Sequence, residues 1–194
     1  MVRHVPPVRK LQPGHTIVFP NREKASSKAT KAIVVFILLV SVALMLVVTI
    51  GGWSKLQGLK VVNFVWCAVY LIIAFYIATR WARGLLPIAA AMAILLLILS
   101  LIAGLGVSGT SWFDRSNPGF AAPESLFGGA GLDPNLLGIL TLIIAPVQAL
   151  LILFAMRGFA QGWNVEVDMP IEEAQRRGHQ ITTPPAPPPR AAPA

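Results

Sequence analysis

The sequence predicts an all-α, polytopic membrane protein with four transmembrane helices and both termini in the cytoplasm. First, four uncharged apolar segments each have about the length of a bilayer-spanning helix. Second, only 12% of the 194 residues are charged, about half of the roughly 25% that is usual in a soluble domain. Third, the basic residues gather at the ends of the apolar segments, mostly on one side, which is typical of membrane orientation.

The four predicted spans cover residues 32–53, 61–79, 84–107 and 135–156. About 20 apolar residues are enough to cross a hydrocarbon core of about 30 Å. None of the four segments contains Asp, Glu, Lys, Arg or His, and none has the polar stripe of a soluble core helix. A cleavable signal peptide is the alternative for the first span. Its apolar region would be only about 7–15 residues long, whereas this span is longer and follows a hydrophilic leader.

The distribution of basic residues predicts the orientation. Thirteen of the sixteen Lys and Arg residues fall in the leader, the turn after the second span and the tail, and three fall on the opposite side. The positive-inside rule therefore places both termini in the cytoplasm. Amphipathic indole rings favour the headgroup zone. We therefore interpret the tryptophans near the span ends as interfacial anchors, namely Trp53, Trp81, Trp112 and Trp163.

The chain divides into three regions: a basic, proline-containing leader (1–31), a membrane domain (32–157) and a cytoplasmic tail (158–194). The membrane domain includes an outer loop over residues 108–134. The tail is predicted to form a short helix over about 169–177, supported by Glu–Arg pairs four residues apart, and to end in a disordered proline-rich stretch. Residues 15–19 are a candidate strand and residues 164–168 alternate with a period of two, so the sequence allows a two-stranded pairing, which is marginally stable alone.

The second and third spans carry the first candidates for intramembrane contacts. At helical spacing, Asn63, Cys67 and Tyr70 share one face of the second span, and their polar groups favour the bundle interior over lipid. We interpret this face as a helix–helix contact, and the alternative is part of a groove for a small molecule or lipid. In the third span Ser100 and Gly104 are four residues apart, a spacing of small residues that lets two helices approach closely.

The fourth span carries the best candidate for a special intramembrane site. Asp133 and Pro134 are a suitable cap and first residue for this helix. Pro146 removes a backbone hydrogen bond, so a kink is expected there. Gln148 lies near mid-depth, where its amide needs a partner from another helix, a water or another subunit. The plainer interpretation is a kink plus one interhelical hydrogen bond.

The outer loop contains aromatic residues between Gly and Pro turns. Long loops are usually functional or disordered. We interpret the loop as a candidate interaction surface, and the alternative is a passive segment lying on the headgroups. An enzyme site built on its acidic residues is the least favoured interpretation, because no nucleophile–base pair accompanies them. The candidate interaction residues are Trp112, Phe113, Phe120 and Phe127.

The sequence predicts no catalytic, cofactor-binding or metal-binding residue and no cofactor. The spans lack the ionisable groups of proton and ion pathways, and the single cysteine excludes an internal disulfide. We expect a non-catalytic accessory or assembly subunit of a bacterial inner membrane, a source indicated by the Ala, Gly and Pro content and the short loops. The alternative is a transporter or channel for a neutral or lipidic solute that uses the kink in the fourth span. The expected partners are the lipid bilayer and other membrane subunits or a second copy, but not nucleic acid.

Overall fold

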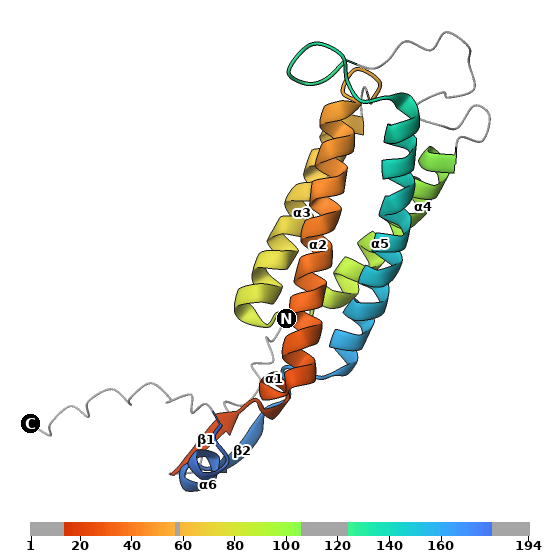
Figure 1. Cartoon of the computed structure of the whole chain (residues 1–194). Helices are drawn as coiled ribbons and strands as arrows, with labels where there is room; N and C mark the ends of the chain where they lie inside the picture. The colour runs from red at the N-terminus through yellow and green to blue at the C-terminus, as the bar shows by residue number, and fades with distance from the viewer. Residues whose placement is uncertain (1–13, 57–58, 106–123, 180–194) are drawn as a thin grey trace, which may run out of the picture.

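The computed structural model describes residues 14–56, 59–105 and 124–179 (Figure 1). Four long helices stand side by side, and the segments before the first and after the last meet at one end of them. In chain order the elements are β1 (His15–Val18), α1 (Pro20–Glu23), α2 (Ala25–Gly51), α3 (Leu59–Arg80), α4 (Leu85–Leu105), α5 (Pro134–Ala160), β2 (Val167–Pro170) and α6 (Ile171–Arg176).

The four long helices, α2 to α5, are each long and apolar enough to cross a membrane, and their number equals that of the predicted spans. The largest difference lies at the start of the first span. Helix α2 begins at Ala25, seven residues before the predicted start. The prediction counted only apolar residues, but a helix continues through the headgroup zone, where Lys28 and Lys31 reach polar surroundings. For the same reason α5 continues beyond Arg157 to Ala160.

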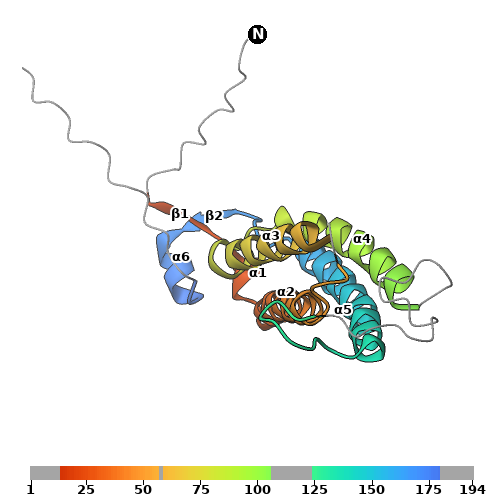
Figure 2. The same cartoon turned by 90° about the horizontal axis from the view of Figure 1, so that it is seen from above.

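The helices pack in the order α3, α2, α5, α4, and the contact between α3 and α4 is much smaller than the others (Figure 2). The core lies where the four helices face one another and contains Leu38, Tyr70, Ile77, Ala93 and Leu151. The opposite faces leave large apolar side chains exposed on every long helix, among them Phe36, Phe75, Leu95 and Leu153. Such exposure suits a hydrocarbon solvent and would be costly in water.

Small residues allow α4 and α5 to approach closely. Gly104 of α4 lies against Leu142 of α5, and a Cβ atom on Gly104 would come within 2.6 Å of the Leu142 Cγ and 3.0 Å of its backbone nitrogen. Ser100, one turn earlier, is buried, and its hydroxyl donates to the Leu97 carbonyl at 2.9 Å. The predicted close approach through Ser100 and Gly104 is therefore present, with α5 as the neighbour.

A two-stranded antiparallel sheet corrects the strictly all-α prediction. β1 pairs with β2 in a register that places His15 opposite Pro170 and Val18 opposite Val167. The second strand starts three residues later than the predicted residues 164–168, because the residues before it form a turn that contacts α1. Helix α6 therefore also begins later than predicted, at Ile171.

The two strands and α6 form one unit with its own small core, which we call the terminal unit (residues 15–18 and 167–176). Val18, Met169 and Ala174 are buried together there. The predicted pairing of Glu173 with Arg177 is present, with Nη2 of Arg177 and Oε1 of Glu173 2.6 Å apart. Figures 1 and 2 show this unit at one end of the long helices, away from the turn that precedes α5.

Replacement of Gly104 by Ala should lower the free energy of unfolding by about 1–3 kcal/mol, because the added methyl group must displace the Leu142 side chain and press on its backbone. Unfolding of the purified chain in mixed micelles measures this. Gly84→Ala is the matched control, because no atom lies within 4 Å of a Cβ built at Gly84, and it should change stability by less than about 0.5 kcal/mol. Equal effects of the two substitutions would contradict the close approach of α4 and α5.

Candidate functional site

The amide of Gln148 joins three helices inside the membrane domain. Gln148 of α5 is fully buried, and its Oε1 accepts a hydrogen bond from the Tyr70 hydroxyl of α3 at 2.9 Å. Its Nε2 donates to the Ser41 Oγ of α2 at 2.9 Å, and Ser41 in turn donates to the Ile37 carbonyl at 2.8 Å. We call Ser41, Tyr70 and Gln148 the Gln148 bridge. It pairs polar groups that have no water to bond in hydrocarbon.

Pro146 lies in α5 two residues before Gln148, and the helix continues through it. A proline cannot donate the hydrogen bond that the carbonyl of Leu142 would otherwise receive. Leu142 is also the residue against which Gly104 of α4 packs. The structure therefore brings the predicted residues Pro146, Gln148 and Tyr70 into one region, with Gly104 beside the turn that the proline weakens. The kink stays a prediction.

A second hydrogen bond joins α2 and α3 farther from the terminal unit. The Asn63 Nδ2 donates to the Thr49 Oγ1 at 3.0 Å, and Thr49 donates to the Met45 carbonyl at 2.7 Å. Cys67 is buried on the same face of α3, between Asn63 and Tyr70. All three residues are buried on the face of α3 that meets its neighbours, and their role as a contact site stays a prediction. A lipid groove along this face has no support, because neighbouring helices cover it.

The partners of this face on α2, Ser41 and Thr49, were not among the residues predicted from the sequence. Ser41 and Thr49 are eight residues apart in α2, and both are buried. Eight residues are slightly more than two turns, so the two side chains share one helix face. They stand out in the printed sequence as the hydroxyl residues of the first predicted span. Their spacing was therefore a usable signal for the face of α2 that meets α3 and α5.

All four long helices line a small cavity next to Asn63. Its volume is about 20 Å³, and its polar lining comes from Asn63, Ser100 and Thr141. Such a volume holds about one water molecule. The hydroxyl of Thr141 donates within α5, to the Leu137 carbonyl at 2.8 Å, as that of Ser100 does within α4. The cavity therefore suits a single bound water rather than the passage of a solute.

The buried polar side chains of the described residues are all uncharged. The interior described here can therefore hold helices together by hydrogen bonds, but it offers no carboxylate, amine or imidazole to move a proton. Among the same residues, no group of three or more His, Cys, Asp or Glu side chains lies in a position to hold a metal ion. No protein-family model, curated protein or solved structure matches the chain.

A junction near the terminal unit joins α2, α3 and the turn after α5. Trp163 is fully buried, its indole N–H donates to the Gln161 Oε1 at 2.9 Å, and its ring meets Trp81 edge to face at 5.4 Å between centroids. Gln161 also donates from Nε2 to the Thr30 Oγ1 at 3.0 Å. Trp163 thus packs inside the protein and does not turn its ring outward, and its depth relative to the headgroups stays a prediction. Gly158 lies under its ring, with 3.0 Å from a built Cβ to the indole, and leaves it room to pack inside.

Arg22 fastens the segment before α2 to the turn after α5. Its Nε donates to the Trp163 carbonyl at 3.0 Å, and its Nη2 donates to the Asn164 Oδ1 at 2.9 Å. Burial lowers the pKa of the Arg22 guanidinium, and the charge of Glu166 offsets part of that effect. Arginine nevertheless stays protonated in proteins. A neighbouring side chain adds a third link, because the Asn21 Nδ2 donates to the Gly162 carbonyl at 3.1 Å.

At the opposite end, residues 124–132 form what we call the outer turn. The backbone of Leu126 donates to the Ile50 carbonyl at 3.2 Å, and that of Leu132 donates to the Gly51 carbonyl at 3.0 Å, so the turn is fixed to the end of α2. Phe127 stands at its tip with 84% of its surface exposed. The other candidates of the outer loop, Trp112, Phe113 and Phe120, lie outside the described residues.

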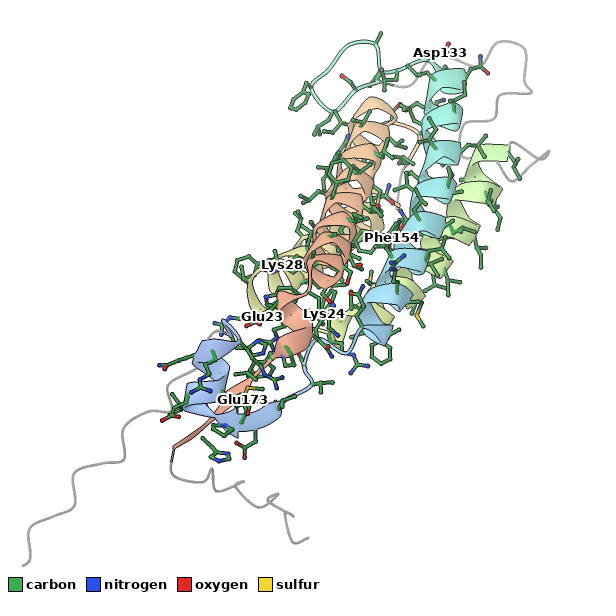
Figure 3. All side chains as sticks on the ribbon, turned by 60° about the horizontal axis from the view of Figure 1, so that its bottom comes forward. Glu23, Lys24, Lys28, Asp133, Phe154 and Glu173 are labelled. Carbon is green, nitrogen blue, oxygen red and sulfur yellow. The ribbon has the colours of Figure 1, made fainter. Side chains whose placement is uncertain are left out.

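Asp133 ends the outer turn and caps α5 as predicted. Its Oδ1 accepts from the backbone N–H groups of Asn135 at 2.8 Å and Leu136 at 3.3 Å, and Pro134 is the first helical residue. Figure 3 shows Asp133 at this end of the structure and Lys28 toward the other. The carboxylate of Asp133 is thus used for helix capping, which weakens the least favoured interpretation, an enzyme site in this loop.

Replacement of Tyr70 by Phe should lower the free energy of unfolding by about 0.6 kcal/mol, and by no more than about 1.7 kcal/mol, because it removes one interhelical hydrogen bond inside the membrane. Tyr76→Phe is the matched control on the exposed face of α3 and should change little. In a double-mutant cycle with Gln148→Leu the two effects should not add, since both break the same bond. Additive effects would contradict the Gln148 bridge.

Proposed function

We propose that the chain is a non-catalytic accessory or assembly subunit of a bacterial inner-membrane complex, acting through helix and loop contacts. The observation that carries this proposal is the Gln148 bridge. It joins α2, α3 and α5 with uncharged groups that bond to one another, so the described interior serves cohesion. Surfaces that could act on another molecule then lie outside the bundle, on the outer turn, the terminal unit and the exposed helix faces.

The outer turn supports a role in contacts. An isolated aromatic side chain at 84% exposure gains little from its own chain, yet the turn that carries Phe127 is held by hydrogen bonds to α2. Gly128 and Gly129 adopt positive φ angles of 86° and 78°, which favour glycine, so the local sequence fits this conformation. A rigid, exposed aromatic residue is typical of an anchor for a partner or for the headgroup layer.

The charges at the end that carries the terminal unit support a cytoplasmic location for it. The basic residues described at this end are Arg22, Lys24, Lys28, Lys31, Arg80, Arg83, Arg157, Arg176 and Arg177. The end that carries the outer turn has Lys55 and Lys60. The positive-inside rule favours the first end for the cytoplasm, and with four spans both terminal segments share that side.

The alternative, a transporter or channel for a neutral or lipidic solute, has less support. Both ends of the Gln148 amide are occupied by Ser41 and Tyr70, and the cavity beside Asn63 is about 20 Å³ in volume. Passage of a solute at this point would require the helices to separate.

The proposal predicts that Gln148→Leu leaves the flux of neutral solutes across reconstituted vesicles equal to that of the unaltered chain, within measurement error, because the amide holds helices and lines no path. Protein-free vesicles supply the background. Flux above that background, reduced at least about tenfold by Gln148→Leu, would favour the transporter instead.

Purification of the full chain from native membranes in a mild detergent should recover a partner subunit, or a second copy, in fixed stoichiometry. Phe127→Ala should reduce recovery of that partner at least about tenfold, because truncation of an aromatic anchor typically costs 2 kcal/mol or more. Quantitative mass spectrometry after chemical crosslinking measures both quantities.

Phe75→Ala is the matched control, because Phe75 is also an exposed phenylalanine, at 61%, but lies on α3 within the membrane domain. Loss of the partner with Phe75→Ala and not with Phe127→Ala would move the contact to the helix face and remove the role of the outer turn. A monodisperse single chain, crosslinked to nothing, would contradict the proposed function itself.

A further inference from the structure

An apolar groove runs along α2 and the end of α3, beside the contact between Trp81 and Trp163. Its volume is about 520 Å³. Two lysines, Lys28 and Lys31, stand at one end of it, and apolar side chains, among them Phe36, Leu39 and Ala78, line the rest. The groove therefore combines positive charge at one end with hydrocarbon-like walls along its length.

The groove has the length of one bilayer leaflet. Lys28 and Leu39 are eleven residues apart on α2, which at 1.5 Å per residue is about 16 Å. The hydrocarbon core is about 30 Å thick, so one leaflet is about half of that. With the lysines at the headgroup level, Leu39 then lies near the middle of the bilayer. An occupant that fits is charged at one end and apolar over about one leaflet.

The charge available in the groove comes from Lys28 and Lys31. Lys28 is exposed and has no ion-pair partner within the described part of the chain. The Lys31 Nζ lies 4.1 Å from the centroid of the Trp81 ring, a cation–π contact that leaves its N–H donors able to bond an anion. Figure 3 shows Lys24 and Lys28 close to the terminal unit.

Two nearby arginines, Arg22 and Arg83, already bond within the chain, and among the described residues no arginine lines the groove. Arg22 donates to the Trp163 carbonyl at 3.0 Å, and Arg83 donates to the Phe159 carbonyl at 2.8 Å. The two lysines are thus the cations that the groove itself presents. Their positive charge is complementary to an acidic headgroup and would repel a basic peptide.

Trp81 forms a fixed wall at the charged end. It follows the last residue of α3 and has a φ of 52°, in the left-handed region that favours glycine. Its ring is held in place by Lys31 on one side and by the buried Trp163 at 5.4 Å between centroids. The indole therefore keeps its position at the headgroup level whether or not the groove is filled.

We propose that this groove is a binding site for one anionic phospholipid. The phosphate lies between Lys28 and Lys31, and an acyl chain follows Phe36 and Leu39 over Ala78 toward the bilayer centre. Basic pockets between transmembrane helices are a recurrent site for anionic headgroups. A transmembrane helix of a partner is the competing occupant, and the test below separates the two.

The full chain is reconstituted into nanodiscs of phosphatidylcholine with a small fraction of phosphatidylglycerol, and lipids retained by the released protein are counted by native mass spectrometry. The unaltered chain should retain one phosphatidylglycerol in preference to phosphatidylcholine. Lys28→Gln with Lys31→Gln should lower that preference about 30-fold, because each basic residue near an anionic headgroup contributes about 1 kcal/mol and tenfold in binding corresponds to about 1.4 kcal/mol.

Two further variants make the test specific. Ala78→Phe fills the groove and keeps both lysines, so it should also abolish preferential retention, and it serves alone if the double lysine variant fails to fold. Lys60→Gln is the matched control at the other end, where the Lys60 Nζ lies 4.3 Å from the centroid of the Trp53 ring, and it should leave retention unchanged.

The same measurements can overturn the proposal. Full retention in Ala78→Phe would show that phosphatidylglycerol is attracted by surface charge and not held in the groove. An equal loss in Lys60→Gln would lead to the same conclusion. No preference in the unaltered chain would overturn the lipid site, and this result would leave the accessory-subunit proposal standing.

Discussion

The structure depends on the absence of water from the interior of the membrane domain. An amide placed at mid-depth must find its donors and acceptors on other helices, and Gln148 finds them on α2 through Ser41 and on α3 through Tyr70. In water these bonds would be exchangeable with solvent, and little would be gained by making them. In hydrocarbon they fix which helices are neighbours and how far each is rotated about its axis. Apolar packing can then proceed with small residues such as Gly104 at the closest point.

The junction near the terminal unit, where Trp81 and Trp163 meet, is held together in a different way. There the chain leaves the hydrocarbon, and buried aromatic rings are combined with charged and polar groups. Trp163 packs against Trp81 while Arg22 and Gln161 bond to it or to its backbone. These contacts connect the segment before α2 and the end of α3 to the turn after α5. The terminal unit continues directly from this junction, because β1 precedes α1 and β2 follows the turn after α5.

Much of this arrangement was predictable, because span length and the lack of charge follow directly from the solvent. The buried face of the second span was also predictable, since Asn63, Cys67 and Tyr70 recur at helical spacing. The hydrogen-bond partners of the buried polar side chains were harder to predict. Gln148 required a partner, but several helices could have supplied one, and the spacing of Ser41 and Thr49 marks a face of α2 without naming the side chain that meets it. The packing of Trp163 was hard to predict for a related reason: the position of a tryptophan near a span end does not reveal that Gly158 leaves it room to pack inside. The strand register shifted because tertiary contacts of the preceding turn decided where β2 could begin.

The pairing of β1 with β2 has a consequence for how the chain is made. His15 and Asp168, which contact each other at 3.0 Å, are 153 residues apart in the sequence. During synthesis β1 emerges first, and its ladder partner does not exist until all four helices have left the ribosome. Throughout that interval the strand presents unpaired backbone groups to its surroundings. The ribbon can therefore close only after the sequence of all four helices has been synthesised, and a chain released early would carry an open edge in place of the paired strands.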